Sequence, residues 1–178
     1  KKKVSIIEKA IQLISDEKKI LGNLDKEEIN YLNTYQLIST KPVVYICNVD
    51  ENSALSGNEF TKKIDTYSKE NNSEVLLISA KIESEISQIT DFKDKQDFLE
   101  SMGLKETGLK RVIKKGYEIL NYINYFTAGE KELRAWTITK GTLAPSAAGT
   151  IHSDMEKGFI RAETISFNDY LSHKGEAG

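Results

Sequence analysis

The sequence has little cysteine, little proline and no long apolar run. Cys47 is the single cysteine, so the chain cannot form an internal disulfide, which fits a reducing cytosol. No stretch approaches the roughly 20 apolar residues of a membrane-spanning helix, and no signal peptide is visible. We therefore expect a cytoplasmic protein without a membrane partner.

The sequence also lacks an excess of charge of one sign. It has 25 Lys and Arg against 27 Asp and Glu, which gives a net charge of -2. Such a balance provides no overall basic field for nucleic acid, so we expect no DNA partner, while a local basic patch stays open. His, Cys and acidic residues show no metal-ligand spacing, and His152 and Asp154 lie two apart, which does not bring them together on a helix. We therefore assign no catalytic residue and no metal ligand.

A phosphate-binding loop is missing as well. P-loop NTPases hold phosphates and Mg²⁺ with the pattern G-x-x-x-x-G-K-[ST]. The nearest segment, Gly103–Lys110, has its lysine one place late and no Ser or Thr after it, so we interpret it as a turn between helices. No Asp-x-x-Gly is present either. We expect the chain by itself to be inactive as an NTPase.

The chain does contain two apolar runs that each open into a polar loop. Pro42–Cys47 leads into Asn48-Val49-Asp50-Glu51, and Val75–Ile78 leads into Ser79-Ala80-Lys81. Near-continuous apolar runs predict strands that are covered on both faces. Polar loops at the carboxyl ends of parallel strands are where nucleotides bind in α/β folds. Glu83 and Glu85, just after the second loop, are interpreted as a solvated helix start.

Helical periodicity precedes and follows these runs. A heptad seam predicts either one arm of a coiled-coil hairpin or an amphipathic helix packed on a sheet, and both stay open. Its members are Val4, Ile7, Ile11, Ile14, Lys18 and Leu21. We expect this helix to end at Gly22-Asn23, and a second one to begin after Asp25 with Glu28 completing a capping box. Further helices are expected within residues 60–67, 82–100 and 109–121.

The pattern changes after Tyr122. Leu133–Ile138 alternates like a strand, Gly141–Pro145 turns into a helix, and Phe159–Ile165 predicts another strand. Strand, helix and strand in so short a span indicate a small α+β module. Because the sequence starts with Lys1 rather than methionine, we expect a piece of a longer protein.

These motifs resemble the YchF/Ola1 family, an Obg-related group of translation-factor-class P-loop NTPases, over nearly the whole chain. The two polar loops match its base-binding loops. The most specific matches are Tyr125–Gly129, Arg134–Ile138, Gly141-Thr142, Ala144-Pro145, Ala147–Gly149, Ile151–Asp154, Gly158–Glu163, Asn168–Tyr170 and Gly175–Gly178.

The resemblance implies an α/β fold with three parts. Residues 1–40 would be a helical or coiled-coil arm, residues 41–121 the C-terminal part of a P-loop (G) domain, and residues 122–178 an incomplete β-grasp-like TGS domain. It also implies a parent protein that binds and hydrolyses ATP, with GTP as a second nucleotide and Mg²⁺ as cofactor. The implied partner is the ribosome, as the large subunit or as a whole, together with RNA through the TGS module.

The resemblance implies a purine-base site at Asn48, Val49, Glu51, Ser79, Ala80 and Lys81. In P-loop GTPases the first loop reads Asn-Lys-x-Asp: the Asp clamps guanine's N1–H and 2-amino group, and the Lys covers the base. An Ala N–H of the second loop meets the guanine carbonyl. Here Val49 replaces the Lys, so that an apolar side chain would cover the base, and the longer Glu51 replaces the Asp. Loss of this clamp removes the penalty against adenine, which has no 2-amino group.

The last module supports a different function class. Its basic and aromatic residues predict either an RNA-contact face or a small core beneath ordinary surface lysines. They are Lys131, Arg134, Lys140, Lys157 and Arg161, with Tyr125, Phe126, Trp136 and Phe159. The alternative function is therefore a non-catalytic chain that binds RNA or protein through a coiled coil and a TGS module.

Overall fold

The structure is a computed structural model that describes residues 2–129 and 132–173. The chain divides into two compact units, residues 1–120 and residues 121–178. Each unit has its own helices and strands. Within the described ranges, no helix is both long enough and apolar enough to cross a membrane.

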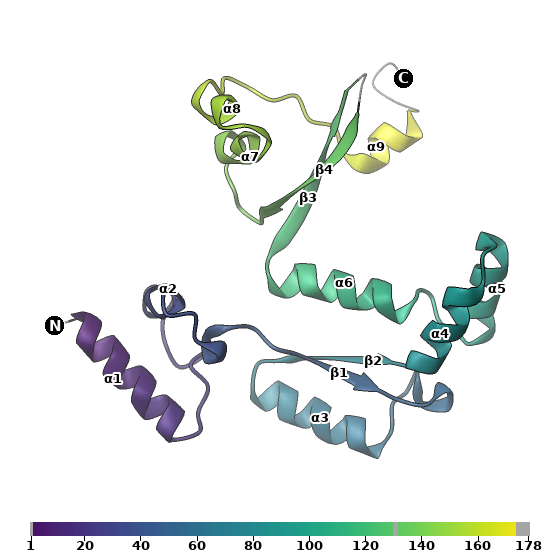
Figure 1. Cartoon of the computed structure of the whole chain (residues 1–178), viewed down its shortest axis with the longest axis horizontal. Helices are drawn as coiled ribbons and strands as arrows, with labels where there is room; N and C mark the ends of the chain where they lie inside the picture. The colour runs from purple at the N-terminus through teal and green to yellow at the C-terminus, as the bar shows by residue number, and fades with distance from the viewer. Residues whose placement is uncertain (1, 130–131, 174–178) are drawn as a thin grey trace. The chain divides into compact units, whose positions relative to one another are not determined.

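The first unit is built on two parallel strands. β1 (Val44–Asn48) pairs in parallel with β2 (Glu74–Ile78), so that Asn48 lies opposite Ile78. The connecting helix α3 (Glu59–Glu70) covers one face of the pair, and α6 (Gly108–Ile119) lies on the other (Figure 1). The near-continuous apolar sequences predict strands covered on both faces. Helices lie on both faces, but the cover is partial, because the residues of both strands are half-buried or exposed and Ile46 is 49% exposed. Parallel pairing brings the loops after β1 and β2 to the same edge.

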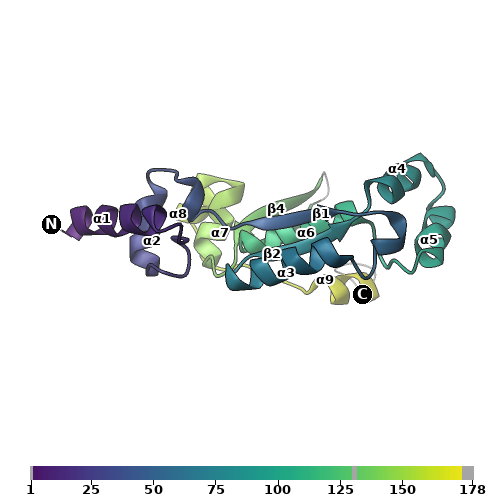
Figure 2. The ribbon, with the colours of Figure 1, turned by 90° about the horizontal axis from the view of Figure 1, so that it is seen from below.

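A small core holds the helices beyond that edge. α4 (Ala80–Gln88) follows β2 directly, and α5 (Phe92–Ser101) comes next. Figure 2 shows both helices at one end of the strand pair, with α1 and α2 at the other end. The buried side chains of this core cluster come from the first loop, α4, α5 and the turn after α5. They are Ala54, Ile82, Ile86, Leu99 and Leu104.

The helical segment before β1 is shorter than the sequence predicts. α1 (Lys2–Ser15) and α2 (Lys26–Asn33) precede a short 3₁₀ turn, η1 (Ile38–Thr40). The predicted capping box is confirmed, because Asp25 accepts from the Glu28 amide and Glu28 accepts from the Asp25 amide. The predicted end at Gly22-Asn23 is wrong. Glu17 takes a left-handed conformation with φ of +56°, and the helix stops before it.

This early stop changes which residues of α1 are buried. Lys18 and Leu21 no longer lie on the helix. Ile6 and Ala10 are buried in a cluster that also contains Ile20 and Leu32. The remaining members of the predicted seam lie beside this buried stripe, and three of them are at least half exposed. They are Val4, Ile11 and Ile14.

The second unit is a hairpin with three helices. β3 (Tyr122–Ala128) pairs antiparallel with β4 (Leu133–Thr139). α7 (Ala144–Ile151) packs on β4 and on α8 (Ser153–Lys157), and α9 (Phe167–Ser172) follows. The Tyr125 hydroxyl donates to the Ala147 carbonyl at 2.8 Å, which ties the hairpin to α7.

The predicted strand at Phe159–Ile165 is wrong. This segment lies outside the strands of the described chain, and Ile160 is 91% exposed. A segment with strand-forming residues becomes a strand only where a neighbouring strand satisfies its backbone groups. No described strand pairs with this segment.

Candidate functional site

The first polar loop is held in shape by its own backbone and by Asp50. The Val49 amide donates to the Ile78 carbonyl at 2.8 Å, which extends the β1–β2 ladder by one residue. Asp50 accepts from the Ser53 amide at 2.9 Å and caps a 3₁₀ turn, η2 (Glu51–Ser53). This backbone hydrogen bond to the carboxylate lowers the pKa of Asp50. The loop is therefore an ordered turn.

The second polar loop is the start of α4. Ser79 is the N-cap residue, yet its side chain caps no amide of the helix. Ser79 is only 4% exposed, and its hydroxyl is buried without a hydrogen-bond partner in the structure. A buried hydroxyl without a partner is costly, so this position calls for an explanation.

Two contacts join the loops to each other. The Ala80 amide donates to Asn48 Oδ1 at 3.0 Å, across 32 residues of sequence. The carboxylate of Glu51 forms an ion pair with the Lys81 ammonium. Four of the six predicted site residues are thus in direct contact at the carboxyl ends of β1 and β2.

The Glu51–Lys81 pair places opposite charges side by side at this edge. The hydrogen bond from Lys81 lowers the pKa of Glu51, and the bond to Glu51 raises the pKa of Lys81. Both side chains keep contact with solvent, at 31% exposure for Glu51 and 66% for Lys81. A carboxylate acceptor and an ammonium donor therefore lie together where a ligand can reach them.

Val49 occupies a different place from the one its position suggests. A residue that covers a base would need an accessible side chain. The Val49 side chain is 9% exposed and packs inward. It has little surface left for stacking, and it lies beneath the loop.

Glu83 is a residue that sequence reasoning placed wrongly. Its carboxylate accepts from the Gly108 amide at 2.6 Å and from the Leu109 amide at 3.1 Å, at the start of α6. The interpretation of Glu83 as a solvated helix start is therefore wrong, while Glu85 is exposed. A sequence signal did exist. α6 has a Thr107 cap but carries Lys110 at the position where a capping box has Glu, so a carboxylate from elsewhere can serve.

Arg111 joins α6 to β2 as well. Its guanidinium Nη2 donates to the Leu77 carbonyl at 2.7 Å, close to the point where β2 ends. The start of α6 is therefore joined both to β2 and, through Glu83, to α4.

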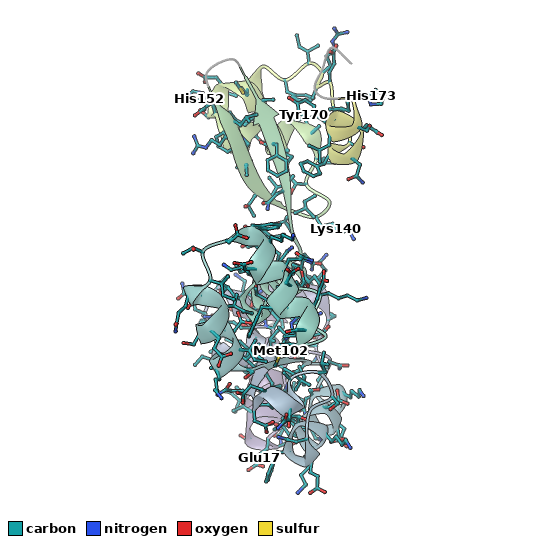
Figure 3. The ribbon with its side chains drawn as sticks, turned by 90° about the vertical axis from the view of Figure 1, so that its right-hand side faces the viewer. Glu17, Met102, Lys140, His152, Tyr170 and His173 are labelled. Atoms are coloured by element: carbon teal, nitrogen blue, oxygen red, sulfur yellow. The ribbon has the colours of Figure 1, made fainter. Side chains whose placement is uncertain are left out.

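The histidines lie outside this site. Figure 3 shows His152 and His173 well apart in the second unit. His152 Nδ1 accepts from the Asp154 amide at 3.2 Å and caps α8, which is a structural role. Across residues 2–129 and 132–173, no three His, Cys, Asp or Glu residues gather as a metal site would require. No residue in this part of the chain is therefore assigned to Mg²⁺.

The basic and aromatic residues of the second unit do not form one face. The guanidinium of Arg134 lies 4.1 Å from the centre of the Trp136 ring, and Trp136 Nε1 donates to Thr127 at 3.0 Å. Phe126 points to the opposite side of the hairpin, where it meets Phe167 at 5.8 Å between ring centres. The remaining predicted residues are scattered or engaged. Lys131 lies outside the described residues, Arg161 pairs with Glu163 at 3.3 Å, and Lys140 and Lys157 are exposed.

Comparisons with known proteins cover both units. Residues 122–178 match the family model YchF-GTPase_C, described as a protein of unknown function (DUF933). The chain is 42% identical over 176 residues to "Ribosome-binding ATPase YchF" of Haemophilus ducreyi, covering 98% of the chain and 48% of that protein. It is 46% identical over 155 residues to the protein of the same name in Bacillus subtilis, covering 86% and 42% respectively.

A solved structure gives the same result for the fold. "Structure of the Schizosaccharomyces pombe YchF GTPase" matches with a TM-score of 0.82 and 34% identity. The match covers 97% of this chain and 47% of that chain. The mixed α/β fold is therefore that of a solved relative, and the chain spans about half the length of the proteins it resembles.

Proposed function

The chain belongs to the YchF/Ola1 family, and on that premise we propose that it carries the purine-base side of a ribosome-associated, ATP-binding ATPase. The observation that carries this proposal is the 3.0 Å hydrogen bond from the Ala80 amide to Asn48 Oδ1. It joins two loops that follow neighbouring parallel strands, which is where α/β folds bind nucleotides.

The geometry supports adenine over guanine. In the guanine-binding arrangement an Ala amide meets the base carbonyl, but here the Ala80 amide already donates to Asn48. In the same arrangement a carboxylate takes both guanine donors, but Glu51 is ion-paired with Lys81. Adenine offers an amino donor beside a ring acceptor, which a carboxylate next to an ammonium can satisfy. ATP is therefore the preferred nucleotide in this proposal, and GTP the weaker one.

The other site residues have supporting roles in the proposal. Ser79 would supply its buried hydroxyl to a bound nucleotide or an accompanying water, which would satisfy an otherwise unpartnered group. Lys81 would lay its aliphatic stem along the base while its ammonium holds Glu51. Val49 would form the floor beneath the loop, in keeping with its burial.

Hydrolysis belongs to the longer protein in this proposal. The sequence contains no G-x-x-x-x-G-K-[ST], and the described residues offer no cluster of Mg²⁺ ligands. We derive no catalytic step from this chain, and propose that phosphate and Mg²⁺ contacts come from other parts of the protein. A cytoplasmic location accompanies a ribosomal partner.

The proposed test converts the first polar loop to the sequence pattern that binds guanine. In a full-length protein that carries this segment, Val49→Lys with Glu51→Asp restores Asn-Lys-x-Asp. We expect the ratio of GTP to ATP affinity to rise by about tenfold or more, because a matched set of buried hydrogen bonds discriminates strongly between bases. Asn48→Ala should lower the affinity for both nucleotides. Isothermal titration with each nucleotide measures these changes.

The control variant is Asn52→Ala, which removes an exposed amide from the same loop. It should leave both affinities within about twofold of the unmodified protein, since surface changes away from a contact have small effects. Unchanged base preference in the double variant, together with unchanged affinity in Asn48→Ala, would refute the base-site assignment.

A second candidate function concerns the second unit. Arg134 is exposed and stacks on Trp136, so it presents a planar cation on a rigid hairpin. Planar cations beside aromatic rings suit RNA phosphates and bases. We propose that this pair contributes to RNA contact by a TGS module at residues 122–178, and that α1 forms part of a coiled-coil arm. The half-exposed side chains of Val4, Ile11 and Ile14 support the arm.

A further inference from the structure

The contact between Glu83 and α6 has a feature that structural capping alone does not require. The carboxylate comes from the first turn of α4, three residues after Ala80 of the base loop, and it reaches an element 25 residues further along the chain. A helix start can be capped by a neighbour in sequence, and Thr107 already serves that purpose for α6. The Glu83 contact therefore also constrains α4, the helix that carries the accepting carboxylate.

The first turn of α6 is completely satisfied. The Gly108 and Leu109 amides donate to Glu83, the Lys110 amide donates to the Thr107 hydroxyl at 3.2 Å, and the Arg111 amide donates to the Thr107 carbonyl at 3.2 Å. A helix start normally leaves such amides without helical partners. A carboxylate at this end also interacts favourably with the helix dipole. Removing Glu83 would leave two amides without an acceptor.

Gly108 is the residue that permits this approach. A Cβ atom at position 108 would lie 3.0 Å from Glu83 Oε1 and 3.0 Å from the Ile78 side chain. The first of these atoms belongs to the contact, and the second belongs to the end of β2. Any larger residue at position 108 would push the carboxylate or the strand end away.

The second polar loop, Ser79-Ala80-Lys81, has few other supports. Ser79 gives α4 no side-chain cap, so the position of the loop depends on contacts with other elements. These contacts are the Asn48–Ala80 hydrogen bond, the Glu51–Lys81 ion pair, the burial of Ile82 and the Glu83 contact with α6. Of these four, only the Glu83 contact connects the loop to α6.

We propose that Glu83 is a positioning residue for nucleotide recognition. By holding the first turn of α4 against the start of α6, it sets where Ala80 and Lys81 face the base, and so contributes to discrimination between ATP and GTP. Glu83 touches no nucleotide in this proposal. The inference rests on the proposed base site, and it makes the start of α6 part of that site's specificity.

The first test needs no nucleotide. In the chain itself, Glu83→Gln keeps the side-chain shape but replaces one acceptor oxygen with a donor that faces an amide. We expect hydrogen exchange of the Ala80 and Lys81 amides to accelerate by about tenfold, because charged hydrogen bonds to amides are among the stronger ones. The amides of α3 should keep their rates. NMR-detected exchange measures both sets in one experiment.

The second test measures base preference in a full-length protein that carries this segment. Glu83→Gln should narrow the ratio of ATP to GTP affinity by about tenfold at a temperature where the variant is folded. Gly108→Ala approaches the same contact from α6 and should produce the same change. Glu85→Gln, an exposed carboxylate of the same helix, is the matched control and should change neither quantity.

The outcomes separate the two proposals. A lower melting temperature for Glu83→Gln with an unchanged nucleotide ratio and unchanged exchange at Ala80 would make Glu83 purely structural, and would overturn the inference. Failure of the Val49→Lys, Glu51→Asp double variant to alter base preference, together with unchanged nucleotide affinity in Asn48→Ala, would instead refute the base site. If hydrogen exchange of the Ala80 amide accelerates equally in Glu83→Gln and in Glu85→Gln, that result would also count against a specific role for Glu83.

Discussion

Single residues determine the shape of the first polar loop, which follows β1. The loop from Asn48 turns through η2 and reaches Gly57, whose φ of +70° lies in the left-handed region. The Gly57 amide donates to the Ser53 carbonyl at 2.8 Å and closes the turn. A Cβ at this position would lie 2.3 Å from the Thr61 hydroxyl, which belongs to the capping box of α3. One glycine therefore joins the end of the loop to the start of α3.

We expect Gly57→Ala to lower the free energy of unfolding of the first unit by about 2 kcal/mol. A left-handed conformation costs an alanine about 1–2 kcal/mol, and the clash with Thr61 adds to it. The comparison variant is Gly116→Ala in α6, where a Cβ would meet no atom within 4 Å. It should raise stability by about 0.5–1 kcal/mol, because alanine favours helix over glycine. Urea unfolding followed by circular dichroism measures both, and equal effects would contradict the argument.

At the scale of elements, the sequence predicts what depends on local patterns. The capping box of Asp25 and Glu28 needs only residues three apart, and it is present. The two apolar runs predict β1 and β2, and both strands are present, although neither is fully buried. The two polar loops that follow these strands could thus be located before the structure.

The failures at this scale involve partners far away in the chain. Phe159–Ile165 is predicted as a strand but has no described strand beside it. The role of Glu83 depends on α6, 25 residues further on. Lys110 indicates that α6 lacks a capping box, but it does not specify which carboxylate caps the helix. The end of α1 depends on Glu17 adopting a left-handed conformation, which is rare for that residue type. Tertiary contacts and backbone exceptions of this kind leave little trace in one sequence.

The position of α4 depends on its buried face as well as on its hydrogen bonds. Ile82 is 1% exposed and packs with Ala54, Leu99 and Leu104. We expect Ile82→Ala to lower the free energy of unfolding by about 2–5 kcal/mol, through lost burial and the cavity left behind. Ile38→Ala, at a residue 83% exposed, should cost less than about 0.5 kcal/mol. Urea denaturation compares the two, and similar losses would show that α4 is not anchored by this core cluster.

At the scale of the whole molecule, two units of different character follow each other in the chain. The first carries the contacting loops of the proposed base site, and the second carries Arg134 on a hairpin. Neither unit has a large excess of one charge to drive binding: residues 1–120 contain 19 Lys and Arg against 20 Asp and Glu, and residues 121–178 contain 6 against 7. The proposed RNA contact would therefore rely on a few individual cations, which makes single substitutions informative.

We expect the 178-residue chain to sediment with ribosomes in a salt-dependent way. If about two phosphates are contacted, a fourfold increase in salt should weaken binding by about tenfold. Arg134→Gln should weaken binding further at low salt and reduce the salt slope by about one, because it removes one cation from the contact. Lys62→Gln removes the same charge from an exposed position on α3 in the first unit and should have no such effect. Equal losses in the two variants would indicate general electrostatic attraction, and no sedimentation at any salt concentration would exclude this chain as a ribosome-contacting segment.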